Sequence, residues 1–211
     1  MKEVLKDYIN DKIKYDKKKI IIILSFVIAI SGFVGWLYEF IFYYFNFGME
    51  HFYWRGGNFL PWINIYAIGA ILILICTHKI KKHPLLVFLV SMLVTGILEY
   101  ISGWAILEFL GKRFWNYNVE ILNFGNINGF ICLRSVLIFG ISALFLVYGI
   151  VPFIIKMINK FNNKKLMIIG LILVSIIFID EFYNLVISNV FNLPNAIDVY
   201  GSLGFNIMER W

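Results

Sequence analysis

Residues 95–109 read TGILEYISGWAILEF, an apolar stretch that carries two glutamates, Glu99 and Glu108, on either side of Gly103. The whole chain is similarly apolar: 61% of its 211 residues are hydrophobic and 15% are charged. Soluble domains usually contain about 25% charged residues. The composition therefore predicts an integral membrane protein, and the stretch raises the question of what two carboxylates do inside a membrane span.

Five apolar segments have the length of a transmembrane helix, at residues 20–44, 60–77, 85–109, 130–155 and 166–190. Each can cross a hydrocarbon core of about 30 Å at about 1.5 Å per residue. We therefore expect an all-α, polytopic helix bundle with about five transmembrane helices. The chain divides into a basic leader at 1–19, one transmembrane domain at 20–190 and a short extracytoplasmic tail at 191–211.

Basic residues alternate between the predicted loops, and Lys and Arg in short loops stay on the cytoplasmic side. The predicted inner loops hold 14 of them and the outer ones 4, which are Arg55, Lys112, Arg113 and Arg210. This split places the N-terminus inside and the C-terminus outside in a multi-pass protein of the cell membrane. Topology accounts for the net charge of +6, and we expect no nucleic-acid partner.

The leader has apolar residues at helical spacing, interrupted by charges: Val4, Leu5, Tyr8, Ile9 and Ile13. This pattern suits a short helix lying on the anionic inner leaflet. A solvated basic leader that only fixes the topology explains it equally well.

The sequence predicts neither a metal nor a cofactor. Cys76, His78 and His83 are close in sequence, but no carboxylate lies near them. The chain contains no GxxxxGK[ST] phosphate-binding loop, so it cannot hydrolyse ATP by that route.

Ionisable residues cost about 2.5 to 3.5 kcal/mol each near the centre of a span and usually have a function there. Counted along the predicted helices, Glu39, Glu99, Asp180, Glu181 and Arg134 all fall in the same, outer half of the bilayer. This coincidence across four helices predicts one shared polar site.

Spacing on the helices supports a cavity at that depth. Glu39 shares a helix face with Trp36, and Glu99 shares one with glycines that allow close packing. We expect a cavity open to the outside, lined by Glu39, Glu99 and Asp180, with Arg134 as counter-charge. One arginine cannot neutralise four acids, which favours a hydrated or ligand-binding cavity over purely structural ion pairs; the latter remain the alternative.

All six tryptophans fall in the outer half or in outer loops: Trp36, Trp54, Trp62, Trp104, Trp115 and Trp211. Aromatic faces beside carboxylates suit a cationic or hydroxylated ligand. Trp36 and Trp104, which share segments with Glu39 and Glu99, are the candidates for such contacts.

Four patterns together resemble a known family: GWLYE at 35–39, RGGNFLPWINIYAIG at 55–69, EYISGWAILE at 99–108 and FWNYNVEILNFGNINGFICL at 114–133. The resemblance is to the ABC-transporter type IV, or CmpB-like, bacterial membrane proteins. It implies a permease-like membrane component with a separate cytoplasmic ATPase subunit. It also adds Arg55, Tyr66, Tyr100 and Glu108 to the site residues.

The sequence departs from the family pattern at Asn64, Asn116 and Phe130. Phe130 stands where the family tends to have arginine, and Arg134 follows it at the spacing of one helical turn. We therefore expect Arg134 to bring its guanidinium to nearly the same place.

The leading prediction is a permease-like protein or transporter component, not an enzyme, that binds a small polar or cationic solute in an outward-facing carboxylate and aromatic cavity. The alternatives are an intramembrane enzyme acting on a lipid-linked or envelope substrate, and a structural or regulatory subunit. Self-association is left open. The candidate substrate-binding residues are Glu39, Glu99, Arg134, Trp36, Tyr100, Asp180, Arg55, Tyr66 and Glu108.

Overall fold

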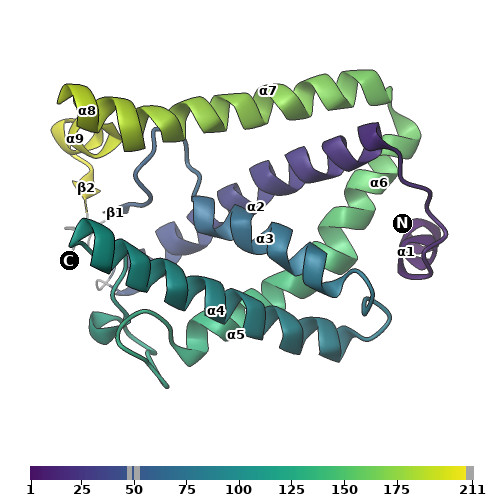
Figure 1. Ribbon diagram of the computed structural model, residues 1–211, viewed down its shortest axis with the longest axis horizontal. Coiled ribbons are helices and arrows are strands. Elements are labelled where there is room, and N and C mark those ends of the chain that lie inside the picture. The colour runs from purple at the N-terminus through teal and green to yellow at the C-terminus, as the bar shows by residue number, and fades with distance from the viewer. Residues whose placement is uncertain (47–48, 50–52, 208–211) are drawn as a thin grey trace.

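The computed structural model describes residues 1–46, 49 and 53–207, and helices dominate these residues (Figure 1). Arg210 and Trp211 lie outside the described residues. Four helical stretches are long and apolar enough to cross a membrane. They are α2 (Lys17–Asn46), α4 (Pro84–Leu110), α5 (Leu133–Phe145) continuing through a π-helical turn (Leu146–Ile150) into α6 (Val151–Lys160), and α7 (Asn163–Phe182) continuing through a second π-helical turn (Tyr183–Ile187) into α8 (Ser188–Phe191).

Shorter elements complete the described part of the chain. They are α1 (Lys2–Ile9), β1 (Tyr53–Trp54), α3 (Asn64–Thr77), the 3₁₀ turn Tyr117–Val119, α9 (Ala196–Ser202) and β2 (Asn206–Ile207). The two strands pair in parallel and join the segment after α2 to the segment after α9.

The expected all-α membrane bundle is confirmed, but the segment predicted at 60–77 differs from a full span. Its helix, α3, has 14 residues and is about 21 Å long at 1.5 Å per residue, too short for a core of about 30 Å. Ile63, two residues after Pro61, is still extended, and the helix begins only at Asn64. The described residues therefore form four helical stretches of spanning length and one short apolar helix.

Sequence signals explain several helix boundaries. Pro84 occupies the start of α4, where a missing N–H costs nothing, and Gly111 ends α4 with a positive φ of 63°. The Asn162 side chain caps α7 by accepting the N–H groups of Lys164 and Lys165. A π-helical turn precedes Pro152, whose ring nitrogen has no hydrogen to donate.

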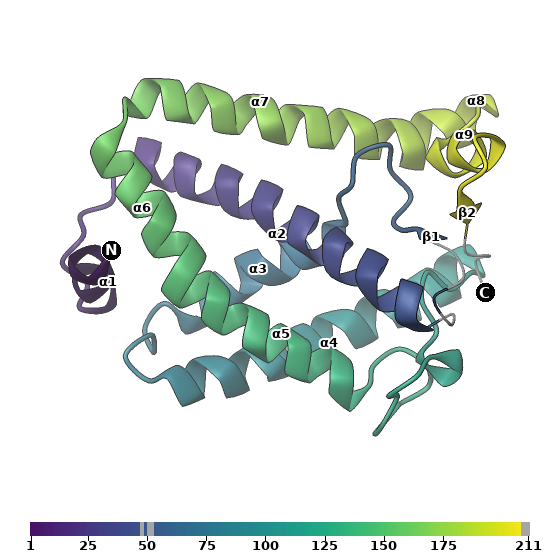
Figure 2. The same cartoon turned by 180° about the vertical axis from the view of Figure 1, so that it is seen from behind.

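The long helices are arranged around α2 and α3. Helix α2 packs on α7, α3 and α6, whereas α4 packs on α3 and α5. Figures 1 and 2 show α1, the 78–83 loop and the α6–α7 turn at one end of the bundle, and β1, β2, α8, α9 and the 111–132 segment at the other. The predicted inner loops thus share one end; which side of the membrane this end faces stays a prediction.

Helix α1 packs on protein through its apolar face. Val4, Leu5, Ile9 and Ile13 pack against the buried core cluster that includes Tyr8 and residues of α6. The Lys81 ammonium lies 2.7 Å from the Asp11 carboxylate and 4.2 Å from the centre of the Tyr8 ring. The bundle therefore covers the face that the sequence assigned either to the leaflet or to water.

Two glycines of α2 allow neighbouring segments to approach closely. A Cβ atom on Gly32 would lie 2.0 Å from Nε1 of Trp62, and one on Gly35 would lie 2.1 Å from Cγ of Tyr66. Such close backbone approach is typical of small residues at membrane helix contacts.

Replacing Gly35 with alanine should separate α2 from α3, because the new methyl group would also lie 2.6 Å from Cβ of Tyr66, which no side-chain rotation moves away. We expect a loss of about 1–3 kcal/mol of stability, as for other overpacked sites. Thermal unfolding in detergent measures it. Gly149→Ala is the control, since nothing lies within 4 Å of its added Cβ; equal losses in both variants would contradict the packing explanation.

The α1 contact should weaken in acid. The hydrogen bond from Lys81 and its charge lower the pKa of Asp11, so the contribution of this carboxylate is present above its unfolded pKa and is lost as the pH falls through the lowered one. Spin labels at positions 3 and 160 should move apart in acid in the wild type. Asp11→Asn should show the longer distance at every pH, and Asp7→Asn should behave as wild type; a distance independent of pH in the wild type would exclude this role.

Candidate functional site

A non-helical segment, residues 55–63, enters the bundle between α2 and α7 (Figures 1 and 2). The Asp180 carboxylate accepts the backbone N–H groups of Phe59 at 3.0 Å and Leu60 at 2.7 Å. The Trp62 indole donates to the Ile28 carbonyl in α2 at 3.1 Å. Irregular backbone at membrane depth is stable only when its polar groups find partners in protein or water, and Asp180 supplies two of these partners.

The first residue of this segment forms an ion pair with α2. Arg55 is 7% exposed, and its Nη2 and Nε lie 2.9 and 3.0 Å from one Glu39 oxygen. The Arg55 guanidinium also lies 3.8 Å from the centre of the Tyr43 ring. The backbone carbonyl of Arg55 accepts the Trp36 indole N–H at 3.1 Å. Trp36 thus holds the backbone of the residue that neutralises Glu39.

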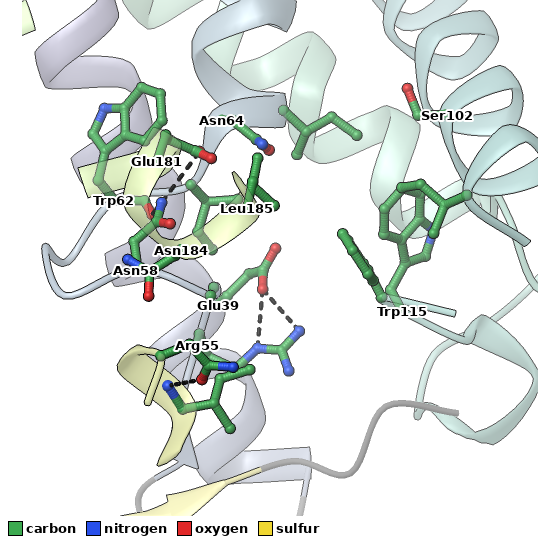
Figure 3. A pocket seen from close by; sticks show the side chains of 18 of the residues that line it. Glu39, Arg55, Asn58, Trp62, Asn64, Ser102, Trp115, Glu181, Asn184 and Leu185 are labelled. Atoms are coloured by element: carbon green, nitrogen blue, oxygen red, sulfur yellow. Dashed lines mark hydrogen bonds and ion pairs between the residues drawn. The ribbon is translucent and has the colours of Figure 1, made fainter. Parts of the chain in front are cut away.

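A cavity of about 390 Å³, here called the large cavity, lies beside this segment (Figure 3). Among the described residues that line it, Glu39 and Glu181 contribute carboxylates and Arg55 contributes a guanidinium. Glu181 accepts a hydrogen bond from Asn58 at 3.1 Å and has no ion pair among the residues that the structure describes. With both acids ionised, the described residues of the wall carry one net negative charge, and it is located at Glu181.

The rest of the wall is aromatic, amide and apolar. Trp54, Trp62 and Trp115 contribute indole rings, and Asn58, Asn64, Asn184, Asn189 and Asn195 contribute amides. Helix α4 lines the opposite side with Ser102, Ala105 and Ile106. The large cavity is lined by both α4 and α7. Helix α4 packs on α3 and α5, whereas α7 packs on α2.

A second cavity of about 40 Å³, here called the small cavity, adjoins the first through three shared lining residues, Glu39, Ile65 and Trp115. It is surrounded by the buried ionisable groups of α2, α4, α5 and the 111–132 segment. Glu120 accepts the Tyr43 hydroxyl and lies 2.5 Å from Nη2 of Arg134. Among the carboxylates of the described residues, that of Glu39 alone lines both cavities.

Glu99 is the third carboxylate at the small cavity and is 5% exposed. The Tyr117 hydroxyl donates to its Oε1, and the Ser135 hydroxyl lies 2.8 Å from its Oε2. Burial raises the pKa of Tyr117 well above its usual value, so the phenol keeps its proton and remains a donor. Among the described residues, Glu99 has no Lys, Arg or His ion-pair partner.

The structure brings together five of the nine residues predicted from the sequence. Glu39 and Arg55 line the large cavity, and Glu39, Glu99, Arg134 and Tyr66 line the small one. The sequence predicted Arg134 as the counter-charge of Glu39, Glu99 and Asp180. In the structure, Arg55 pairs with Glu39 and Arg134 pairs with Glu120.

The other four predicted residues line neither cavity. Asp180 caps the 55–63 segment, and Trp36 lies behind Arg55, 5.3 Å from the ring of Trp54. The Tyr100 hydroxyl accepts a hydrogen bond from Asn128 at 3.2 Å, and Glu108 is exposed near the end of α4. Trp104, expected near Glu99, is 47% exposed instead.

The prediction that Phe130 and Arg134 lie on the same face of one helix is wrong. Helix α5 begins at Leu133, so Phe130 precedes the helix and the two residues do not share a helical face. The Arg113 guanidinium lies over the Phe130 ring at 4.6 Å, whereas Arg134 lies over the Phe42 ring at 3.9 Å.

Sequence reasoning did not include Glu120 and Tyr117 in the site, and it counted Glu181 in the shared polar site without naming it as a substrate-binding residue. Glu120 and Tyr117 fall in a segment predicted to be an outer loop, where a carboxylate would ordinarily be solvated; Glu120 is 7% exposed and Tyr117 8%. The pattern at 114–133 contained both, and it was the only signal for them. Glu181 follows Asp180 directly, and neighbouring helix positions point in different directions, so the face assigned to Asp180 did not include it.

Four spanning-length apolar helices with buried ionisable groups define a multi-pass membrane protein. The model of the family described as "Putative ABC-transporter type IV" matches residues 25–185, and the chain belongs to this family. It is thus a transporter-related membrane protein, and the match includes every residue that lines the small cavity. Comparison with curated proteins and with solved structures gave no match.

Replacing Asp180 with asparagine should loosen the 55–63 segment, because an amide offers one acceptor oxygen where the carboxylate offers two. One backbone N–H would then lose its partner inside the bundle, at a cost of about 1–3 kcal/mol. We expect a lower unfolding midpoint in detergent and faster labelling of a cysteine introduced at position 59. Glu108→Gln, which changes an exposed carboxylate in the same way, should alter neither; the prediction fails if the two variants are indistinguishable.

Proposed function

We propose that this protein is the membrane-embedded component of a transport system in a bacterial cytoplasmic membrane, and that its large cavity binds a small polar solute carrying a positive charge. The family assignment supports a transport role. The observation that carries the choice of solute is Glu181, a carboxylate on the cavity wall that has no ion-pair partner among the described residues.

The composition of the wall favours a cation. An ammonium group is attracted to the face of an aromatic ring, most strongly to tryptophan, and three tryptophans line the large cavity together with Glu181. Its volume of about 390 Å³ falls within the range of about 300–1,000 Å³ typical of small-molecule sites. The lining asparagines provide donors and acceptors for a hydroxyl or amide group of the solute.

The Glu39–Arg55 pair has a different role. Each charge is neutralised by the other at 2.9 Å, so the pair adds little net charge to the cavity and instead fixes one of its walls. We therefore assign the binding charge to Glu181 and the shape of the site to Arg55 and Trp36.

The energy source would come from a partner. The chain contains no phosphate-binding loop for ATP, so an ATP-driven system needs a separate ATPase subunit. The lysine-rich end formed by α1, the 78–83 loop and the α6–α7 turn is the end that we propose to face the cytoplasm and such a subunit, by the distribution of positive charge.

Binding of choline tests the proposal, because it joins a quaternary ammonium to a hydroxyl. Isothermal titration of the purified protein in detergent should detect choline binding and no binding of 3,3-dimethylbutan-1-ol, its neutral isostere. Glu181→Gln should weaken binding at least about tenfold, since one lost charge interaction in a partly desolvated site is worth about 1.4 kcal/mol or more.

Glu108→Gln is the matched control and should bind choline as the wild type does, because its carboxylate is exposed at the end of α4 and lines neither cavity. Equal binding of choline and its neutral isostere, or an unchanged affinity in Glu181→Gln, would overturn the assignment of the site to a cation.

A further inference from the structure

Among the described residues, three carboxylates line the small cavity, and two of them have a guanidinium partner. Glu39 pairs with Arg55 and Glu120 pairs with Arg134, whereas Glu99 is held by two hydroxyl groups. A buried carboxylate without a cation is costly in its charged form. Charge balance around the small cavity is therefore complete when one proton resides on Glu99.

The hydrogen bonds around Ser135 fit both protonation states of Glu99. The Ser135 oxygen lies 2.8 Å from Oε2 of Glu99 and 2.9 Å from the Cys132 carbonyl, and it accepts the Cys132 N–H at 3.3 Å. A hydroxyl group has only one hydrogen, so it can donate to Glu99 or to the carbonyl, but not to both.

Each state of Glu99 selects one of these two bonds. When Glu99 is ionised, the hydroxyls of Ser135 and Tyr117 both donate to the carboxylate. When Glu99 carries a proton on Oε2, that O–H donates to Ser135, which turns its own hydrogen to the Cys132 carbonyl. No buried polar atom in this set loses its partner in either state, because the Cys132 carbonyl also accepts the N–H of Val136 at 3.3 Å.

We propose that Glu99, Ser135 and Tyr117 form a proton-binding site, and that the proton exchanges with the large cavity through water in the small cavity beside Glu39. On release, the O–H bond of Glu99 breaks and the proton passes to a water molecule, while the Ser135 hydrogen turns from the Cys132 carbonyl to Glu99. The small cavity, at about 40 Å³, has room for water, which needs about 10–15 Å³ on this measure.

Titratable and charged groups face this site from each element around the small cavity. They are Tyr38, Glu39 and Tyr43 of α2, Tyr66 of α3, Tyr117 and Glu120 of the 111–132 segment, and Arg134 of α5. The tyrosines keep their protons in the ordinary pH range, and the two other acids each have a guanidinium partner. Glu99 is therefore the group in this set whose proton is free to exchange.

This inference concerns the proton alone and does not depend on the solute. Infrared difference spectroscopy of the purified protein, taken between acid and alkaline samples, should reveal the C=O stretch of a protonated carboxylic acid that disappears as the pH rises. Glu99→Gln should remove this band, and Glu108→Gln, which changes the other glutamate of the same helix, should keep it. A titration that is the same in Glu99→Gln as in the wild type would overturn the proposal.

A second variant keeps the test decisive if Glu99→Gln does not fold. Removing the phenol hydroxyl in Tyr117→Phe takes one hydrogen bond from the Glu99 carbonyl oxygen, so the band should move to higher frequency. Protein containing ¹³C-labelled glutamate should shift the same band to lower frequency and thereby identify it as glutamate. A band unmoved by Tyr117→Phe belongs to another carboxyl group, and the proton site would then be rejected.

Discussion

The two hydrogen bonds from the backbone of Phe59 and Leu60 to the Asp180 carboxylate are the interaction on which the rest of this structure depends. Inside a membrane, a helix satisfies its own backbone, whereas a non-helical segment must find every partner elsewhere. Residues 55–63 are such a segment, and α7 supplies an acceptor at the depth where the chain turns back towards α3. Trp62, bonded to the Ile28 carbonyl in the space left by Gly32, holds the segment to α2 from the other side.

The large cavity follows from this arrangement. A straight helix between α4 and α7 would fill the space with side chains over its whole length. The 55–63 segment occupies only part of it, and its own groups, Arg55, Asn58 and Trp62, line what remains. The same turn shortens the following helix, since α3 starts only at Asn64. A short α3, a folded-in loop and a cavity beside them are thus three consequences of one interruption in the helical pattern.

The membrane helices and several site residues could be predicted from the sequence, whereas the ion-pair partners could not, and the difference has a physical cause. The lengths of the apolar segments predicted the membrane bundle. Because the rise per residue is the same in every α-helix, counting residues along each predicted span placed Glu39, Glu99 and Arg134 at one depth, and they line one cavity. Partner choice was not accessible. Arg55 was predicted as a site residue but not as the partner of Glu39, and Glu120 was not predicted, because both lie outside the helices, where helical spacing gives no position. Asp180 was predicted to bind a solute because it is a carboxylate inside a span, but its carboxylate accepts hydrogen bonds from the backbone of its own chain.

The distribution of charge also explains why we propose different roles for the two adjoining cavities. Of the three described acids at the small cavity, Glu39 pairs with Arg55 and Glu120 with Arg134, whereas Glu99 has two hydroxyl partners that fit either of its protonation states. In the large cavity, Glu181 is hydrogen-bonded by the amides of Asn58 and Asn64 and has no ion pair among the described residues. Glu39 lies on both walls, so a change of charge on either side acts on the same ion pair. If Glu99 takes up a proton and Glu181 binds a cation as we propose, both events change the electrostatic field at the Glu39–Arg55 pair, because Glu39 lines both cavities.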